Sequence, residues 1–208
     1  MKTAESTKLS NAFSTGGGGE HFENHVQAVF LLALLIDGFA PVIDNPISKI
    51  EFQGRKNDYE VDDLVIYSEG PTSIVRLHCQ IKHSIQISAH NDIFQSVITA
   101  AWNDYKENPD DKLALVTGLL SKSTMDTLRY IHDQAIHSSD ENEFMHRIEL
   151  PNFTSDDARE KFHVVKACLH NANQNKDVIE SDLWGFWKAF QLVVFDLDYD
   201  AWALCGNE

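Results

Sequence analysis

The sequence predicts an α/β fold in which a mixed sheet is flanked by helices and followed by a helical C-terminal portion. Three observations support this prediction. A helix-like apolar segment precedes several short strand-like runs, a continuous apolar run follows an amphipathic helix, and the chain beyond residue 120 has mostly helical spacing. The 208 residues have the length of one domain. We expect a disordered tail at 1–15 and a domain at 16–208, made of an α/β core (16–120) and a mostly helical extension (121–208).

The first predicted helix follows four consecutive glycines, 16–19, and ends before Gly38. From Phe22 onward apolar residues recur at helical spacing, and 29–36 is apolar throughout, so we expect one long buried helix. That run is shorter than the about 18 residues needed to cross a bilayer. It also lies too far from the start, and too near acidic residues, for a signal peptide. We therefore expect a cytoplasmic protein with no membrane partner.

Three strands are predicted next, and their polar residues are unusual. Asp62 and Asp63 interrupt an apolar strand, which is unfavourable unless the charges are paired or bind a cation. In the third strand polar and apolar residues alternate, so that Gln80 and Lys82 share one face. A hairpin between these two strands would bring Asp63 and Lys82 side by side. The three predicted strands are 47–52, 59–67 and 74–85.

An amphipathic helix at 91–105 is followed by the apolar run 112–119, a pattern that predicts a parallel crossover connection. Aromatic residues at helical spacing in this helix and near the C-terminus favour packing in a core or between subunits over base stacking. The remaining predicted elements are helices at 123–137, 140–147, 154–173 and 180–190 and a strand at 192–197.

The charge balance restricts the class of function. The chain has 17 basic and 32 acidic residues, a net charge of −15 with histidine neutral. Such a charge argues against a protein that wraps a phosphate backbone by itself. A metal-dependent nuclease stays compatible with it, because such a site needs carboxylates. The cysteines, Cys79, Cys168 and Cys205, are far apart, so neither a disulfide framework nor a zinc ribbon is indicated.

The candidate site combines Glu23 in the first helix, Asp63, and the strand residues Gln80 and Lys82. Carboxylate and carbonyl oxygens are ligands for a hard Mg²⁺ or Mn²⁺ ion, which polarises a phosphate and acidifies a water. A lysine beside the metal can orient or deprotonate that water and stabilise negative charge in the transition state. These residues therefore suit phosphodiester hydrolysis.

Three motifs surround these residues. They are Gly-Gly-x-x-Phe-Glu-x-x-Val-Gln-Ala (18–28), Phe-Gln-Gly-Arg-x-x-x-Tyr-x-x-Asp-Asp-Leu (52–64) and Cys-Gln-Ile-Lys-His-Ser-Ile (79–85). The pattern resembles the PD-(D/E)xK, or restriction-endonuclease-like, nuclease superfamily. It is most similar to the N-terminal endonuclease effector domains of bacterial antiphage CBASS effectors and antiviral STAND NTPases. This resemblance covers 16–120 and implies a restriction-endonuclease-like fold, with 16–208 as the nuclease domain. It also implies an endonuclease that cuts double-stranded DNA with little sequence preference and is activated by oligomerisation.

The resemblance also implies residue roles. Glu23, Asp63 and Gln80 would ligate the metal, Asp62 would assist, and Lys82 would act on the attacking water. The sequence leaves open whether Asp62 or Asp63 is the main ligand. Gln80 replaces the acid of the usual pattern, and an amide oxygen is a weaker ligand than a carboxylate.

Partners follow from the same interpretation. Since one active site cuts one strand, double-strand cleavage predicts a homo-oligomer, a dimer or a tetramer. We expect a fused sensor or ATPase module outside this chain, since no phosphate-binding glycine motif is present. Contacts with the DNA are predicted for Arg55, Lys56, Arg76, His83 and Ser84.

Three alternatives stay open at the level of sequence. Lys82 and one of the neighbouring aspartates can form a buried salt bridge without catalysis. The chain can be a partner-binding or oligomerisation domain with a degenerate site, because acidic chains with aromatic helices suit protein contacts. It can also be another metal-dependent phosphoesterase, such as an RNase or a nucleotide hydrolase. His21 and His25 have zinc-ligand spacing, although an ordinary helix surface is the simpler interpretation.

Overall fold

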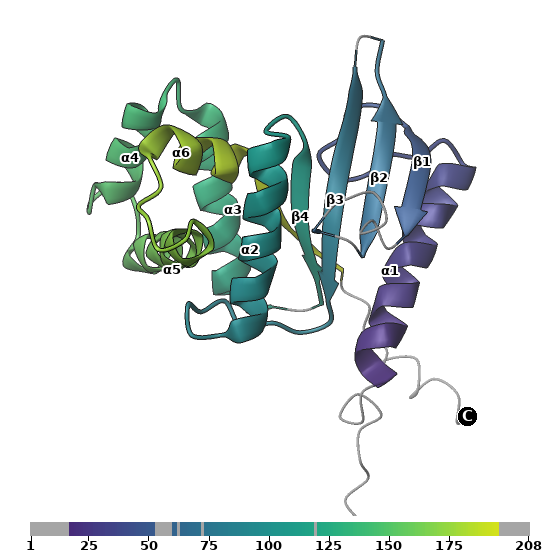
Figure 1. Cartoon of the computed structure of the whole chain (residues 1–208), viewed down its shortest axis with the longest axis horizontal. Helices are drawn as coiled ribbons and strands as arrows, with labels where there is room; N and C mark the ends of the chain where they lie inside the picture. The colour runs from purple at the N-terminus through teal and green to yellow at the C-terminus, as the bar shows by residue number, and fades with distance from the viewer. Residues whose placement is uncertain (1–16, 53–59, 62, 72, 119, 196–208) are drawn as a thin grey trace, which may run out of the picture.

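The computed structural model describes residues 17–52, 60–61, 63–71, 73–118 and 120–195. These residues form an α/β fold around one five-stranded mixed sheet in the order β1-β2-β3-β4-β5 (Figure 1). The first three strands pair antiparallel, and β3, β4 and β5 pair parallel. The predicted parallel crossover is confirmed. The strands are β1 (Ile47–Phe52), β2 (Leu64–Glu69), β3 (Ile74–Lys82), β4 (Lys112–Thr117) and β5 (Phe190–Val194).

Helices cover the sheet on both faces and enclose two hydrophobic cores. The first helix packs against one face, and the five others lie on the opposite side of the sheet (Figure 1). The α/β class and the helical C-terminal portion are therefore confirmed. The helices are α1 (Gly17–Leu35), α2 (Asp92–Glu107), α3 (Lys122–His137), α4 (Glu141–Glu149), α5 (Asp156–Ala172) and α6 (Glu180–Ala189).

Helix α1 is the one long helix that the sequence predicts, but it is buried on one side only rather than throughout. Phe22 and Val26 pack against the sheet with 1% or less of their surface exposed. On the outer side, Leu32 is 61%, Leu35 78% and Ile36 77% exposed. The segment 29–36 is apolar throughout, but the sheet covers only one side of the helix.

The strand boundaries differ from the prediction at the end of the sheet that carries Asp63. We predicted a strand over 59–67, but β2 begins at Leu64, and Asp63 precedes it. The carboxylate of Asp63 accepts the backbone N–H of Ile81, so a side chain replaces a main-chain ladder bond at this point. The third strand ends at Lys82 rather than at residue 85.

The C-terminal elements lie close to the predicted ranges. Helices α2 to α6 begin and end within two residues of their predictions. Side-chain caps explain part of this agreement, because polar side chains accept the orphan N–H groups of the first turn. The last strand begins two residues earlier than predicted, and residues 196 and 197 lie outside the described part of the chain. The capping residues of α2, α3, α4 and α5 are Asn91, Ser121, Asp140 and Ser155.

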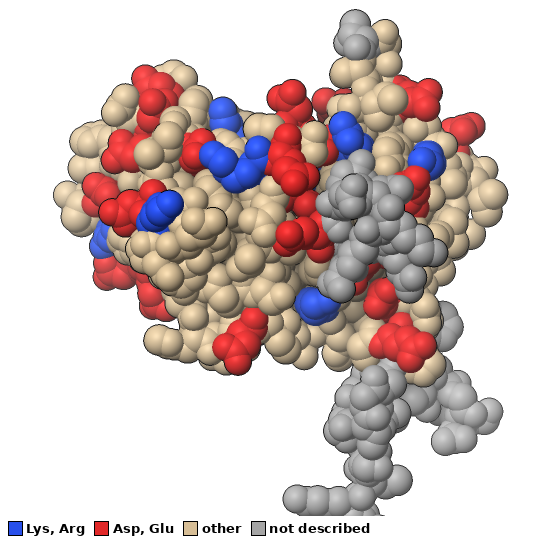
Figure 2. Space-filling view, viewed as in Figure 1, with Lys and Arg blue, Asp and Glu red and all other residues tan. Residues whose placement is uncertain are grey.

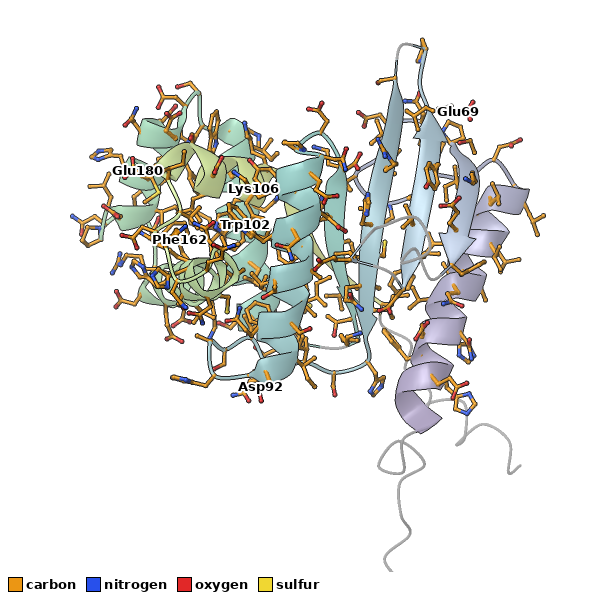
Figure 3. The ribbon with its side chains drawn as sticks, in the orientation of Figure 1. Glu69, Asp92, Trp102, Lys106, Phe162 and Glu180 are labelled. Atoms are coloured by element: carbon orange, nitrogen blue, oxygen red, sulfur yellow. The ribbon has the colours of Figure 1, made fainter. Side chains whose placement is uncertain are left out.

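The helical side of the molecule has an aromatic core, as the helical spacing of these residues predicted. Trp102 and Phe162, labelled in Figure 3, are 3% and 0% exposed. The ring of Phe162 stacks on that of Trp187 with centroids 6.3 Å apart, and Trp102 lies 6.1 Å from Phe186. These rings fix α2, α5 and α6 against one another. Within the described residues, none of the helices combines the length and the apolar character that a membrane crossing requires.

Candidate active site

The candidate site lies where the β2–β3 hairpin opens. One carboxylate oxygen of Asp63, Oδ2, accepts three hydrogen bonds. Its donors are Nε2 of Gln80 at 2.5 Å, the backbone N–H of Ile81 at 2.7 Å and Nζ of Lys82 at 3.2 Å. The structure therefore brings together three of the four residues predicted to be catalytic.

The register of the hairpin explains this arrangement. Leu64 pairs with Cys79, so Asp63 falls opposite Gln80 at the next step of the ladder. Cys79 and Ile81 point toward α1 and belong to its core, and alternation sends Gln80 and Lys82 to the other face. The polar residues of β3 thus face α2.

A pocket of about 330 Å³ opens beside these side chains, between β3 and α2. It has apolar and acidic sides, and Asp92, labelled in Figure 3, marks the start of α2. The side chain of Lys82 is 32% exposed and that of Asp63 17%. A phosphate group can therefore approach Lys82 from solvent, which a fully buried salt bridge would prevent. The pocket is lined by Glu60, Gln80, Lys82, Asp92, Ile93, Ser96, Val97 and Ala100.

The oxygen donors at this site match a hard divalent cation. Mg²⁺ is commonly held by one or two carboxylates, with water and substrate phosphate as the other ligands. Asp63 supplies one carboxylate, and rotation of the Gln80 amide by half a turn exchanges its nitrogen for an oxygen donor. Across the described ranges, the side chains do not include a cluster of three or more His, Cys, Asp and Glu that could hold a metal. Such a cation would depend on Asp63, Gln80 and substrate oxygens.

Glu23 lies on the other face of the sheet from these side chains. The ring of its neighbour Phe22 meets that of His83 edge to face with centroids 5.3 Å apart, which places the start of α1 at the end of β3. The carboxylate of Glu23 accepts a hydrogen bond from Gln27 at 2.9 Å. The start of α1, which carries Glu23, therefore lies at the end of β3, and the role of Glu23 as a ligand stays a prediction.

The described residues among those predicted to contact DNA, Arg76, His83 and Ser84, do not form one surface. Arg76 lies six residues from Lys82 on an extended strand, about 20 Å away, and its Nε is 3.2 Å from Oδ1 of Asp111. His83 and Ser84 follow β3 directly and lie near the site. Arg55, Lys56 and Asp62 are outside the described residues.

A close approach between two chain segments supports the end of β3. The N–H of Gly118 donates to the carbonyl oxygen of His83 at 3.1 Å. A Cβ at position 118 would lie only 2.6 Å from that oxygen, so glycine is required there. This contact ties β4 to the residue that follows Lys82.

Two other candidate reactive groups are explained by their surroundings. Burial and the nearby Asp63 raise the pKa of the Cys79 thiol, which stays protonated and faces the α1 core. His25 hydrogen-bonds through Nδ1 to the backbone carbonyl of His21 at 2.6 Å, an arrangement of the helix surface. Neither group belongs to the pocket.

Sequence reasoning missed three acidic residues near the site. Glu60 and Asp92 line the pocket, and Asp104 is 3% exposed and bonded to the chain just before Asp63. A signal for Asp104 was available, because it interrupts the apolar stripe of the helix that contains Ala101 and Tyr105. Its bonding partners, more than 40 residues away in the sequence, carried no such signal.

Of the charged residues that line the pocket, Glu60 and Asp92 are acidic and Lys82 is basic. Figure 2 shows Asp and Glu side chains gathered along the boundary between α2 and the sheet.

A scan against protein-family models, a search of curated proteins and a search of solved structures each found no match to this chain. The functional argument therefore depends on the site itself.

Proposed function

We propose that this chain is an endonuclease of the PD-(D/E)xK type that uses Mg²⁺ or Mn²⁺ to hydrolyse phosphodiester bonds of double-stranded DNA with little sequence preference. Its sheet would then be of the restriction-endonuclease-like kind. The observation that carries the proposal is the convergence of Asp63, Gln80 and Lys82 within hydrogen-bonding distance at an open pocket.

The side chains have distinct roles in this proposal. Asp63 and Gln80 hold the divalent cation, which when bound supplies the polarisation of the phosphate and the acidification of a water. Lys82 orients that water and stabilises the charge that develops on the phosphate oxygens as one P–O ester bond breaks. The contact of Lys82 with Asp63 keeps its ammonium group at the edge of the pocket.

The test is cleavage of supercoiled plasmid DNA by the purified protein. We expect nicked and linear products with Mg²⁺ or Mn²⁺, none after chelation by EDTA, and a fall of at least about 10²-fold in rate for Asp63→Asn. Asp126→Asn is the matched control, because it removes a carboxylate from an exposed ion pair on α3. Cleavage that survives EDTA would contradict the proposed dependence on a metal ion. Parallel assays on RNA and mononucleotides decide between substrate classes.

The outer face of α1 favours self-association of the nuclease. Between Glu23 and Asp37 the sequence contains no Lys, Arg, Asp or Glu, and Leu32 and Leu35 are largely exposed. Two chains that each carry a net charge of −15 repel one another over most of their surfaces. They can approach closely on this uncharged apolar face, which supports α1 as the contact between two copies. Two active sites would then act on the two strands, in the oligomer-activated antiphage effector that the motifs resemble.

The double variant Leu32→Glu/Leu35→Glu should abolish this self-association, because two charges would face two charges across the contact. Analytical ultracentrifugation should detect a monomer, and plasmid assays should show more nicking and less linear product. Ile179→Glu is the matched control, since Ile179 is 64% exposed at the start of α6. Unchanged sedimentation of the double variant would rule out α1 as the contact.

A further inference from the structure

Helix α2 forms hydrogen bonds with residues 60 and 61, just before Asp63. The buried carboxylate of Asp104 accepts the backbone N–H of Glu60 through Oδ1 and that of Val61 through Oδ2, both at 2.9 Å. Next to it, Nδ2 of Asn103 donates to Oε2 of Glu60 at 2.8 Å. The last turns of α2 thus hold this segment by its main chain and by a side chain.

The hydrogen bond between Asp104 and Val61 lies two residues from Asp63. Val61 is 1% exposed and packs in the core that includes Trp102. On the other side of Asp63, Leu64 enters the ladder with β3. Asp63 is therefore fixed from two directions, by the β2–β3 hairpin after it and by α2 before it.

Burying the carboxylate of Asp104 costs free energy of folding, and stability by itself does not explain why it is there. A carboxylate with 3% exposure loses most of its hydration, and it is compensated by Nδ1 of His78 at 3.4 Å. The other ring nitrogen of His78 lies 3.1 Å from Oδ2 of Asp111. A protein in which apolar residues replace such a buried ion pair is often as stable as the original, or more stable. What an apolar residue lacks is a pair of acceptor oxygens spaced for two consecutive backbone N–H groups.

We propose that Asp104 is a positioning residue for the nuclease site, which sets the place of Asp63 by holding the backbone of Glu60 and Val61. This inference rests on the proposed function. Asp104 does not line the pocket and touches none of the reacting groups, so it acts through Asp63 and through Glu60, which lines the pocket and donates its backbone N–H to Asp104.

The decisive variant is Asp104→Asn, which has nearly the same shape but only one acceptor oxygen. One of the two backbone N–H groups then faces an NH₂ donor and loses its bond. We expect kcat for plasmid cleavage to fall about 10²-fold, the effect of moving a reacting group by about 1 Å. KM should stay within about twofold of the parent, because the DNA contacts are retained. Amide hydrogen exchange at Val61, measured by NMR, should be at least about tenfold faster.

Asp111→Asn is the matched control. Asp111 is as buried as Asp104 and also contacts His78, but its other partner is Arg76 rather than the segment before Asp63. It should lose stability while kcat and the exchange rate at Val61 stay near those of the parent. An equal fall of kcat in both variants, or an unchanged kcat in Asp104→Asn, would overturn the proposal.

Two further measurements keep the outcome decisive. If Asp104→Asn does not fold, Asn103→Ala removes the neighbouring bond to Glu60 from a partly exposed position, and a several-fold fall in kcat at constant KM is expected. An unchanged kcat there would overturn the proposal. If the parent cleaves no DNA, the proposed nuclease fails. Exchange at Val61 in Asp104→Asn and Asp111→Asn then decides by itself whether Asp104 holds the segment.

Discussion

Replacing Lys82 by alanine should lower the rate of plasmid cleavage by at least about 10²-fold, the loss typical of removing one preorganised charge from a transition state. The ammonium group lies 3.2 Å from Oδ2 of Asp63 and lines the open pocket. Alanine would remove the positive charge that stabilises the phosphate oxygens, and the initial rate of loss of supercoiled DNA measures the effect.

The fold should survive this substitution. Asp63 keeps its bonds from Gln80 and from the backbone of Ile81, and Lys82 is part-exposed, so thermal unfolding should change little. Lys122→Ala is the matched control, because it removes a lysine from an exposed ion pair with Asp126 on α3. Its cleavage rate should stay within about twofold of the parent, since exposed pairs contribute little. Parent-like cleavage by Lys82→Ala would favour the interpretation of Lys82 and Asp63 as a structural salt bridge.

The local part of this site could be predicted from sequence. Alternation in the third strand put Gln80 and Lys82 on one face, and the separation of Asp63 from Lys82 suggested the hairpin that the structure contains. Both inferences depend on neighbours along the chain or across one turn. The prediction that the second strand begins at residue 59 was wrong, because the side chain of Asp63 rather than its backbone pairs with β3.

The features that depend on partners far apart in the sequence could not be predicted. The apolar run 29–36 indicated burial, but the tertiary arrangement decides how much of the helix surface the sheet covers. Asp104 bonds to residues 43 and 44 positions away, which periodicity within α2 does not reveal. Alternation correctly put Arg76 on the face of Lys82, yet the length of the strand separates them. Sequence thus predicted the elements and the placement of side chains on the hairpin better than the contacts between layers.

The second large effect concerns stability rather than cleavage. Replacing His78 by leucine should lower the free energy of unfolding by about 3–5 kcal/mol, the usual cost of removing one partner from a buried ion pair. His78 has no exposed surface and lies between the carboxylates of Asp104 and Asp111. Leucine fills similar space but leaves two buried negative charges without this compensating cation.

The same contact predicts how stability changes with pH. Burial alone lowers the pKa of His78, but hydrogen bonds and charge from Asp104 and Asp111 outweigh it, so the pKa is raised above its ordinary value of 6.5. Between that value and the folded pKa the native state binds more protons than the unfolded state. The contribution of His78 is therefore fully present below pH 6.5 and is lost as the pH rises through the folded pKa. Urea unfolding across this range should show stability falling with pH in the parent, and a smaller fall in His78→Leu.

His132→Leu is the control that separates charge from packing. His132 is partly buried, and its Nδ1 bonds to the backbone carbonyl of Trp187 at 2.8 Å. Its replacement should cost about 1 kcal/mol, as for an ordinary hydrogen bond, and leave the pH dependence of the parent intact. Equal losses in the two variants would mean that the buried carboxylates are compensated without His78. A loss confined to His78→Leu would show that His78 stabilises the buried side chains of Asp104 and Asp111.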